Sequence, residues 1–458
     1  MDIGASARRR SGPPTRGPSA RPARAGALAA IALGATACGG GAKIDPATTD
    51  HEVMYLRDAA TRRAALVDEL VVPTNGYSTL RLAHYATGTA GDWDALPAWN
   101  PRAARYPASA LDAAPAAPAL PADAQAFTLP DEARWDPTKP ETGPSELATI
   151  GEDAFFRYPA QLAPPALAPL TREAADRYGL WVDDTNGVGG IVVAETDAGP
   201  ALAFSCASCH ADVVAGRLVP GLPSARVNLG RMLADSGASA DLTANLLAWG
   251  PGRNDVTTSD ASLPERVSDL RPVRFLSHLQ YDATVKQIDL VSLAVRVETL
   301  IITSHGQAIR PPRILALALA EYIWSLADSI QTASDDATPP SPQGQAIFDG
   351  TCSACHAGVG LTSAPRPLAE IGTDPACGLS PDRGTGYYRV PSLRGVSLRP
   401  TLFHDGTLTG LDELLDPMRL DDGYAGGARA PGPVKGHVFG LGLTDTDRAA
   451  LLDYVKTL

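Results

Sequence analysis

The spacing of apolar residues predicts several helices along this chain. Apolar positions recur every three to four residues over 50–71, 282–301 and 313–330, which places them on one face of a helix. The apolar run in the third segment is only 13 residues long and is interrupted by Glu321. Because such a run is too short to cross a bilayer, we expect a buried helix there.

A period of two replaces the helical spacing at residues 189–206. The string GGIVVAETDAGPALAFSC places β-branched and apolar residues on both sides of the turn residues TDAG, which is typical of a β-hairpin. The proline- and alanine-rich residues 107–126 and the string SDDATPPSP at 334–342 are typical of linkers. The 43 glycines and 40 prolines of the chain indicate much irregular structure between its helices.

Residues 341–458 have the pattern of a small helical domain. Ser341 followed by proline is typical of a helix start, and Thr444 is expected to cap the last helix. Each of the two helices carries a pair of residues on one face, which predicts that the helices cross closely beside the second cysteine motif. The pairs are Gly344 with Phe348, and Leu451 with Tyr454.

Two copies of the motif C-x-x-C-H carry the chemistry of the chain. The residues are Cys206, Cys209 and His210 in CASCH, and Cys352, Cys355 and His356 in CSACH. In this pattern the two thiols form thioethers with the vinyl groups of a haem, and the histidine ligates the iron. We therefore expect two covalently bound haem c groups.

Zinc and thiol–disulfide chemistry fit these cysteines less well. The paired C-x-x-C motifs of a zinc site usually lie about 15–20 residues apart, whereas Cys206 and Cys352 are 146 residues apart. A thioredoxin-type motif explains neither the duplication nor the histidine after each pair. Only Cys38 and Cys377 remain, so disulfides are not expected to hold the fold.

The ligand opposite His210 is not evident from the sequence. No histidine or methionine follows His210 until Met232, which lies in a predicted helix and is expected to belong to the core. His278 and His305 come next. Either could be a distal residue of the haem, or could simply form hydrogen bonds with backbone groups. We expect an open distal face at the first haem, where peroxide or dioxygen could bind.

The chain resembles the bacterial di-haem cytochrome c peroxidase superfamily, which includes methylamine-utilisation-type di-haem enzymes and di-haem rubber oxygenases. The resemblance rests on GQAIFDGTCSACH, YYRVPSLRGV, FHDGTLTGLDELLDP and GHVFGLGLTDTDRAALLDYVKTL, and it continues more loosely back to about residue 195. It implies that the second haem passes electrons and that the first meets the oxidant. It also implies that Arg394 and His404 lie near the second haem and its propionates. No glutamate matches the acid–base residue of the peroxidases, so enzymatic turnover stays open.

The same resemblance offers two sixth ligands for the second haem. Met418 follows His404 by fourteen residues, the spacing at which the peroxidases place a methionine. His437 directly precedes the last helix, where relatives with a GHxFGL segment carry a histidine. Because the string LDPMRL around Met418 looks more like a turn than a ligand loop, His437 is preferred. Thioether ligation would give a higher haem potential than two imidazoles.

The first 37 residues are expected to be an export signal. Six arginines precede the apolar run AGALAAIALGATA, whose last residues ATA suit a cleavage site. Cys38 followed by three glycines resembles a bacterial lipobox, although Ala35 stands where leucine is usual. A lipidated Cys38 is favoured over a simple secreted form. Both forms place the protein on the periplasmic or extracellular side of a bacterial envelope, and a lipid anchor would be its link to the membrane.

The chain is acidic. Its formal net charge is −12, and because the predicted leader contributes +5, the mature chain carries about −17. A charge of this sign excludes nucleic acid as a natural partner and favours a small basic redox protein as electron donor.

These patterns together predict a mainly α-helical protein with two cytochrome c-like haem domains, much irregular structure and a small β-hairpin before the first haem. The expected parts are a signal peptide at 1–37, an N-terminal extension at 38–147, a first haem domain at 148–332 and a second at 333–458. We expect an exported di-haem c-type cytochrome that transfers electrons and, if it is an enzyme, reduces peroxide at the first haem. The alternatives are a non-catalytic electron relay and a haem oxygenase acting on an organic substrate.

Overall fold

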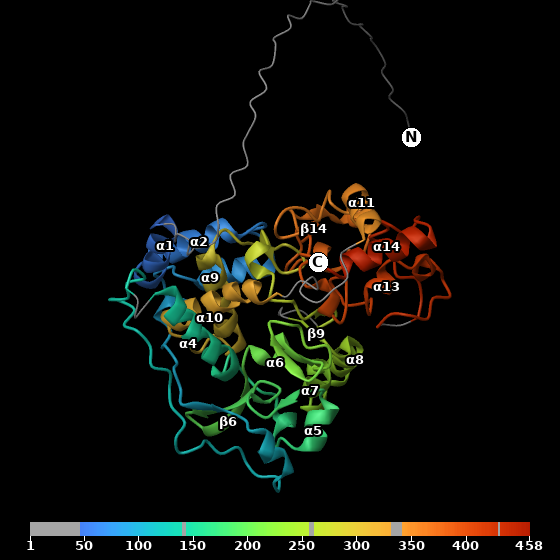
Figure 1. Cartoon of the computed structure of the whole chain (residues 1–458). Helices are drawn as coiled ribbons and strands as arrows, with labels where there is room; N and C mark the ends of the chain where they lie inside the picture. Colours follow the sequence, from blue (N-terminus) through green and yellow to red (C-terminus); the bar gives the residue numbers. More distant parts are fainter. Residues whose placement is uncertain (1–45, 140–142, 256–260, 331–340, 429–430) are drawn as a thin grey trace, which may run out of the picture. The chain divides into compact units, whose positions relative to one another are not determined.

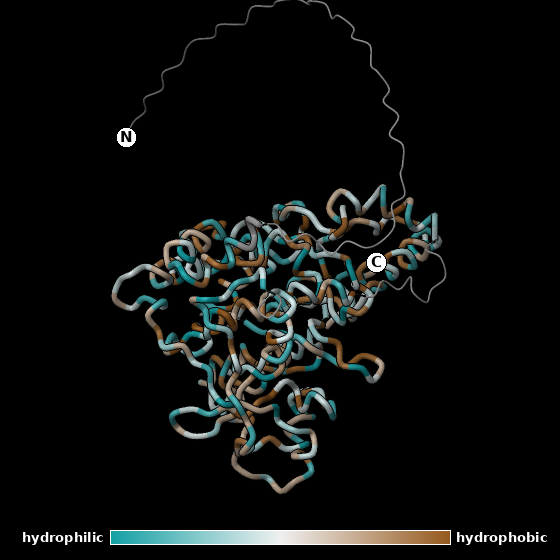
Figure 2. The backbone as a smooth tube through the Cα atoms, turned by 60° about the vertical axis from the view of Figure 1, so that its left-hand side comes forward, coloured by the Kyte–Doolittle hydropathy of each residue, from teal (hydrophilic) through white to brown (hydrophobic). Residues whose placement is uncertain are grey.

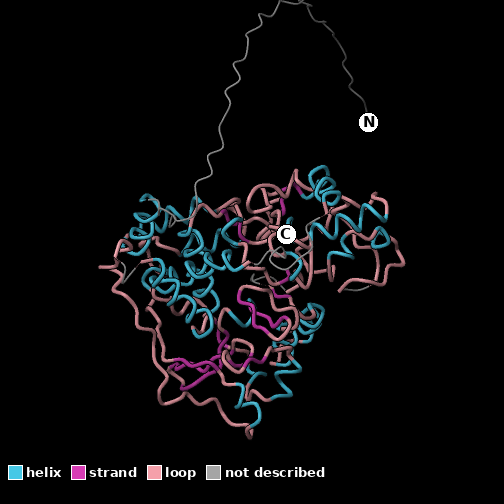
Figure 3. The backbone as a smooth tube through the Cα atoms, in the orientation of Figure 1, coloured by secondary structure: helices cyan, strands magenta, loops and turns pink. Residues whose placement is uncertain are grey.

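The computed structural model describes residues 46–139, 143–255, 261–330, 341–428 and 431–458 (Figure 1). The predicted signal peptide, Cys38 and most of the linker predicted at 334–342 lie outside the described residues. The principal helices are α1 (Pro46–Arg57), α2 (Ala59–Glu69), α3 (Gly76–His84), α4 (Pro144–Arg157), α5 (Arg172–Arg177), α6 (Ala207–His210), α7 (Leu229–Asp235), α8 (Ala240–Trp249), α9 (Leu290–Ser304), α10 (Arg313–Ser325), α11 (Pro342–Thr351), α12 (Leu368–Ile371), α13 (Leu411–Leu414) and α14 (Asp445–Val455). Loops and turns connect these helices over long stretches (Figure 3).

Capping residues explain why some helices differ from the sequence expectation. The predicted helix at 50–71 is two helices, because Asp58 has an extended backbone and its side chain accepts hydrogen bonds from the first amides of α2. The helix expected from residue 282 begins only at Leu290, where Asp289 and Ser292 form a capping box. The eight residues before Leu290 contain a short strand instead.

The predicted hairpin is confirmed and belongs to a four-stranded antiparallel sheet. Its strands pair in register from Ile191 with Phe204 to Thr196 with Gly199. The sheet has the strand order β1-β5-β6-β2 and so recruits a strand from the N-terminal part of the chain. Its members are β1 (Ala103–Arg105), β2 (Gln161–Leu162), β5 (Ile191–Thr196) and β6 (Gly199–Phe204).

Short two-stranded ribbons make up the remaining regular β-structure of the described residues. They are β3 (Val182–Asp183) with β4 (Gly187–Val188), β7 (Ala211–Val214) with β8 (Arg217–Pro220), β9 (Arg253–Asn254) with β10 (Glu265–Arg266), β11 (His278–Leu279) with β12 (Val285–Lys286), and β13 (Arg366–Pro367) with β14 (Tyr387–Tyr388). All of these pairs are antiparallel.

The largest core surrounds α4, α9 and α10. Every residue of α10 from Arg313 to Ala320 is buried, and α4 crosses α10 where Gly151 meets the backbone of Ala318. A β-carbon at Gly151 would lie 1.9 Å from the carbonyl oxygen of Ala318, so only glycine permits this approach. The predicted buried helix is thus confirmed.

The N-terminal helices pack on this core. Leu56 and Leu66, from α1 and α2, lie in the same hydrophobic cluster as α9 and α10. The backbone of Val71 donates a hydrogen bond to Thr284, and that of Tyr77 to Asp382. The N-terminal extension therefore contacts residues both before and after the linker predicted at 334–342.

The described residues contain no helix that is long and apolar enough to span a membrane. Hydrophobic and hydrophilic stretches alternate along the coloured part of the trace (Figure 2).

The helices α11 and α14 cross as the sequence predicted. A β-carbon at Gly344 would lie 2.0 Å from the carbonyl oxygen of Ala450, and the rings of Phe348 and Tyr454 are 5.3 Å apart. Ser341 caps α11, and Thr444 caps α14 by accepting a hydrogen bond from the Asp447 amide. The crossing positions the second C-x-x-C-H motif at the end of α11.

Candidate haem sites

The first motif follows a strand rather than a helix. Strand β6 of the hairpin ends two residues before Cys206, and α6 then forms the single turn that carries Cys209 and His210. The amide of His210 donates to the carbonyl of Cys206 at 3.0 Å, which closes this turn. Burial raises the pKa of the Cys206 thiol to about 12 and that of Cys209 to about 11, so both thiols stay protonated at neutral pH.

His210 is held in the orientation of a metal ligand. Its Nδ1 donates a hydrogen bond to the carbonyl oxygen of Ser268 at 2.9 Å, which leaves Nε2 to face a metal. Burial, with a smaller contribution from the Arg296 charge, lowers the pKa of His210 to about 4, so the ring is neutral as a ligand requires. The Arg296 guanidinium lies 5.6 Å from the centre of the Tyr77 ring, and its positive charge acts on His210.

The candidate distal residues of the first motif are engaged elsewhere. Met232 is fully buried in a hydrophobic cluster with Leu167 and Tyr178, as expected of a core methionine. The Nε2 of His305 lies 3.0 Å from the carbonyl oxygen of Pro159, and the ring of His278 lies beside Ser277. Within the described part of the chain, no ring contact joins His210 to another histidine.

The second motif sits at the C-terminal end of α11. Cys352 is the C-cap residue of this helix, and the backbone amide of His356 donates a hydrogen bond to the carbonyl of Cys352 at 2.9 Å. The Nδ1 of His356 lies 3.2 Å from the carbonyl oxygen of Leu361, so its Nε2 is free to face a metal. The arrangement repeats that of His210 on a different local backbone.

His437 faces His356 across the second site. Their ring centroids are 6.5 Å apart, and two imidazole nitrogens each about 2 Å from one metal ion bring the ring centres to roughly 6 Å. Burial, strengthened by the neighbouring His356, lowers the pKa of His437 to about 4. Its Nδ1 is buried without a hydrogen-bond partner, and its backbone adopts φ of +44°. Met418 is 60% exposed and does not line this site.

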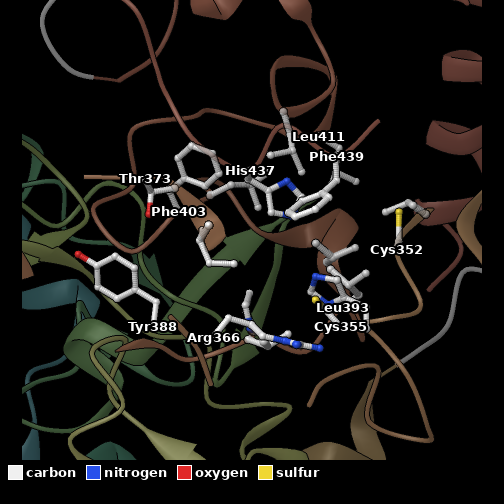
Figure 4. Close-up of a pocket in the computed structure, with 18 of the residues that line it drawn as sticks. Cys352, Cys355, Arg366, Thr373, Tyr388, Leu393, Phe403, Leu411, His437 and Phe439 are labelled. Carbon is white, nitrogen blue, oxygen red and sulfur yellow. The ribbon is translucent and has the colours of Figure 1, made fainter. Parts of the chain in front are cut away.

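The two histidines belong to a largely apolar cavity of about 260 Å³. Figure 4 shows His437 with Phe403 and Phe439 on the opposite side of the cavity from Cys355 and Arg366. Further apolar lining comes from Phe348, Val390, Leu393, Val396, Leu402, Leu411, Leu414, Leu415, Leu451, Leu452 and Val455. A flat apolar macrocycle would find hydrophobic contacts on both faces here.

Buried arginines supply the complementary charge for haem carboxylates. Arg389 lines the cavity, and no hydrogen bond or ion pair reaches its guanidinium within the described residues, although it lies over the ring of Tyr281. Arg266 also lines the cavity, and its Nη1 is buried without a partner. Because a buried, unpaired cation is costly, these orphaned donors fit a bound group that carries carboxylates. The residues present therefore fit haem c.

The resemblance implied that His404 and Arg394 both lie near the haem propionates, but only one of them lines the cavity. His404 is buried and lines the cavity, with its ring stacked on Tyr388 at a centroid distance of 4.4 Å. Arg394 is not among the lining residues; its Nη1 donates to the carbonyl of Val359, and its guanidinium lies over Phe275.

The cavity arginines were missed by the sequence interpretation. Arg389 and Arg399 begin and end the segment RVPSLRGVSLR, of which only the middle arginine was singled out. Both line the cavity, together with Arg266 and Arg366. The one signal in the sequence was the density of arginines in this loop, and nothing in their spacing distinguishes the inward-facing ones.

The cysteines of the motifs are free thiols in this structure, as is the buried Cys377. In the described part of the chain, no group of three or more histidine, cysteine, aspartate or glutamate side chains is arranged to hold a metal ion.

Comparison with known proteins supports the interpretation of the second motif. Residues 341–458 match the model of the cytochrome c family. No curated protein matches the chain.

Several solved structures match between half and three quarters of the chain at low identity. A MauG-like protein associated with microbial copper homeostasis is 18% identical, covers 50% of this chain and 84% of its own, and has a TM-score of 0.32. The di-haem peroxidase BthA from Burkholderia thailandensis is 17% identical, with coverage of 73% and 90% and a TM-score of 0.33. Kuenenia stuttgartiensis hydrazine synthase is also 17% identical, with coverage of 69% and 88% and a TM-score of 0.33.

The family match includes the second C-x-x-C-H motif, the crossing of α11 with α14 and most of the residues that line the cavity. Residues 341–458 are therefore a cytochrome c domain.

Proposed function

We propose that this protein is an exported di-haem c-type cytochrome that transfers electrons and reduces peroxide at its first haem. One observation carries the proposal: the two motifs have different surroundings. His356 faces a second histidine at 6.5 Å, whereas His210 has no facing histidine among the described residues. An iron with two imidazole ligands suits electron transfer, and an iron with an open position can bind a small oxidant.

The residues divide into attachment, ligation and charge compensation. Cys206 and Cys209 would attach the first haem and Cys352 and Cys355 the second, with His210 and His356 as the respective axial ligands. His437 is proposed as the sixth ligand of the second haem because it lines the cavity and faces His356, while Met418 is at the surface. When bound, haem c supplies one-electron redox chemistry, which this chain's own side chains lack.

The cavity side chains control the environment of the second site. Its apolar lining excludes water from the two imidazoles, so both stay neutral. Arg266, Arg389 and Arg399 place positive charge at the edge of the cavity, where haem carboxylates would be neutralised. Positive charge near the site favours the reduced state of the group bound there.

Reduction of hydrogen peroxide to two water molecules takes two electrons and two protons. We propose that a small basic redox protein supplies the electrons, since this chain is strongly acidic. We also propose that the protein is exported to the periplasmic side of a bacterial envelope and carries a lipid anchor at Cys38. The reason is that the same chain contains both the leader pattern and the C-x-x-C-H motifs.

Haem counting and electron paramagnetic resonance test the proposal together. The wild type should retain two haems per chain after acid–acetone extraction, and Cys206→Ala/Cys209→Ala should retain one. The resonance spectrum should contain one low-spin iron with two histidine ligands, and a second iron that binds cyanide or carbon monoxide in at least one redox state. Free haem in the extract would refute covalent attachment. If neither iron binds cyanide or carbon monoxide in any redox state, the result would refute peroxide reduction and favour a non-catalytic electron relay.

A further inference from the structure

Two consecutive residues, Ser268 and Asp269, contact the surroundings of both motifs. The carbonyl oxygen of Ser268 accepts the hydrogen bond of His210 Nδ1 at 2.9 Å. The carboxylate of Asp269 accepts a hydrogen bond from Nε of Arg399 at 2.8 Å, and Arg399 lines the cavity of the second motif. One peptide unit and one ion pair thus join the two sites.

Asp269 is held rigidly between two arginines. Its two carboxylate oxygens accept from Nε of Arg271 at 3.0 Å and from Nη2 of Arg271 at 2.8 Å, in the bidentate geometry typical of strong pairs. The side chains of Asp269, Arg271 and Arg399 are each no more than 4% exposed. A buried pair of this kind is hard to break, because each partner would be left as an uncompensated charge.

The backbone around this ion-pair cluster also connects to the first motif. The amide of Leu270 donates to the carbonyl of Gly221 at 2.9 Å, and the amide of Gly221 donates to the carbonyl of His210 at 2.7 Å. Gly221 has φ of +80°, and a β-carbon there would lie 2.8 Å from Cγ of Arg271. The position of Arg271 is therefore set by the same turn that contacts His210.

Asp269 lies among several buried arginines. Asp269 is the carboxylate that pairs with both Arg271 and Arg399, and the cavity adds Arg266 and Arg389. In a low-dielectric interior, a single carboxylate acts over a longer range than it would in water. A change of charge at Asp269 should therefore act on both His210 and the cavity of His356.

We infer that Asp269 is a positioning residue that couples the two haem sites. It holds Arg399 at the second site and, through the adjoining Ser268 peptide, the ligand His210 at the first. This inference rests on the proposed function, because it requires a haem at each motif. Its consequence is that one charge tunes both reduction potentials in the same direction.

Redox titration of two variants with opposite charge changes tests the inference. Asp269→Asn removes a negative charge and should raise both potentials, because the reduced form of each site is the less positive one. Arg271→Gln removes a positive charge next to the same carboxylate and should lower both. Asp328→Asn is the control. Asp328 also pairs with an arginine, Arg274, but its side chain is 68% exposed, so both potentials should stay unchanged.

Haem content, measured by mass spectrometry, separates this inference from the proposed function. A wild type with fewer than two haems would contradict the proposed function, whatever the potentials. With two haems present, a shift confined to the second haem would overturn the inference and make Arg399 a local partner only. Same-sign shifts in Asp269→Asn and Arg271→Gln would also overturn it, since a merely structural defect has no reason to follow charge. If Asp269→Asn does not fold, Arg271→Gln alone tests the inference: a fall in both potentials supports it, and any other result overturns it.

Discussion

At the scale of single residues, the two imidazoles of the second site face each other on backbone far apart in sequence. His356 follows α11, whereas His437 lies in an irregular loop and has a left-handed backbone that is uncommon for a residue with a β-carbon. A strained backbone at a half-buried histidine whose Nδ1 is buried without a partner is the kind of local cost found at functional sites. The facing geometry is consistent with one metal between two imidazoles.

Replacement of the facing histidine should change the spin state of the second haem. We predict that His437→Ala converts this haem from low spin to high spin, because its sixth ligand is removed. Met418→Leu is the matched control and should leave the visible and resonance spectra unchanged, since Met418 is 60% exposed. A spectral change in Met418→Leu with none in His437→Ala would reverse the assignment.

A second residue-scale prediction distinguishes the cavity arginine from the one that the resemblance singled out. Arg389→Gln should lower the potential of the second haem by tens of millivolts, where about 59 mV is a tenfold change in a one-electron equilibrium. The cause is loss of a buried cation that lines the cavity. Arg394→Gln, outside the lining, should leave the potential nearly unchanged. Spectroelectrochemistry on both variants provides the comparison, and a larger shift in Arg394→Gln would restore the original assignment.

At the scale of elements, close helix crossings decide how the cytochrome c domain is assembled. Helices α11 and α14 can approach only because Gly344 has no side chain: a β-carbon would lie 2.0 Å from the carbonyl of Ala450. At the other end of α11, Gly350 has no atom within 4 Å of the corresponding position. The same helix therefore offers a test site and a matched control.

We predict that Gly344→Ala destabilises the domain by about 1–3 kcal/mol through overpacking. Gly350→Ala should instead stabilise it slightly, by at most about 1 kcal/mol, because alanine is the better helix former. Denaturant unfolding followed through the haem absorbance measures both. Equal effects of the two substitutions would show that helix propensity, and not the crossing, controls the stability of this domain.

The contact of α1 with α10 makes stability depend on pH. Burial raises the pKa of Glu321 to about 7 and, together with the Glu321 charge, that of Glu52 to about 8. A carboxyl whose pKa is higher in the folded state stabilises the fold below about pH 4.5, and this contribution is lost as pH rises through the folded-state pKa. The thermal midpoint should therefore fall between pH 5 and pH 9.

Glu321→Gln should flatten this fall and recover up to about 3 kcal/mol at alkaline pH. The exposed Glu173 on α5 provides the control, because Glu173→Gln leaves both buried carboxyls in place. Differential scanning calorimetry across this pH range measures the effect. An unchanged slope in Glu321→Gln would assign the pH dependence to other groups.

At the scale of the whole molecule, net charge should govern the encounter with an electron donor. The chain has a formal net charge of −12, and charges on two proteins attract over about 10 Å at 0.1 M salt. We predict that reduction by a small basic redox protein slows at least tenfold between low and high ionic strength. Reduction by a neutral small molecule should not slow, and an acidic donor protein should react faster as salt rises. Stopped-flow measurements would detect a salt-independent rate, which would contradict a basic partner.

The sequence by itself determined several local elements and predicted the haem chemistry. Both C-x-x-C-H motifs, the hairpin before Cys206, the buried helix at 313–330 and the pairs at the α11–α14 crossing follow from residue type and short-range spacing. Such features are legible because a covalent attachment motif, a turn and a helical face each involve residues within a few positions of one another.

Only the tertiary structure decided what surrounds the motifs. The facing of His437 with His356, the inward orientation of Arg389 and Arg399, and the junction at Asp269 each join residues separated by tens of residues or more across irregular loops. Whether a loop arginine is buried or exposed depends on how distant segments pack against it, and no local periodicity records that packing. For the same reason, the helix break at Asp58 was hidden within a continuous helical pattern, because a single cap outweighed the spacing of apolar residues.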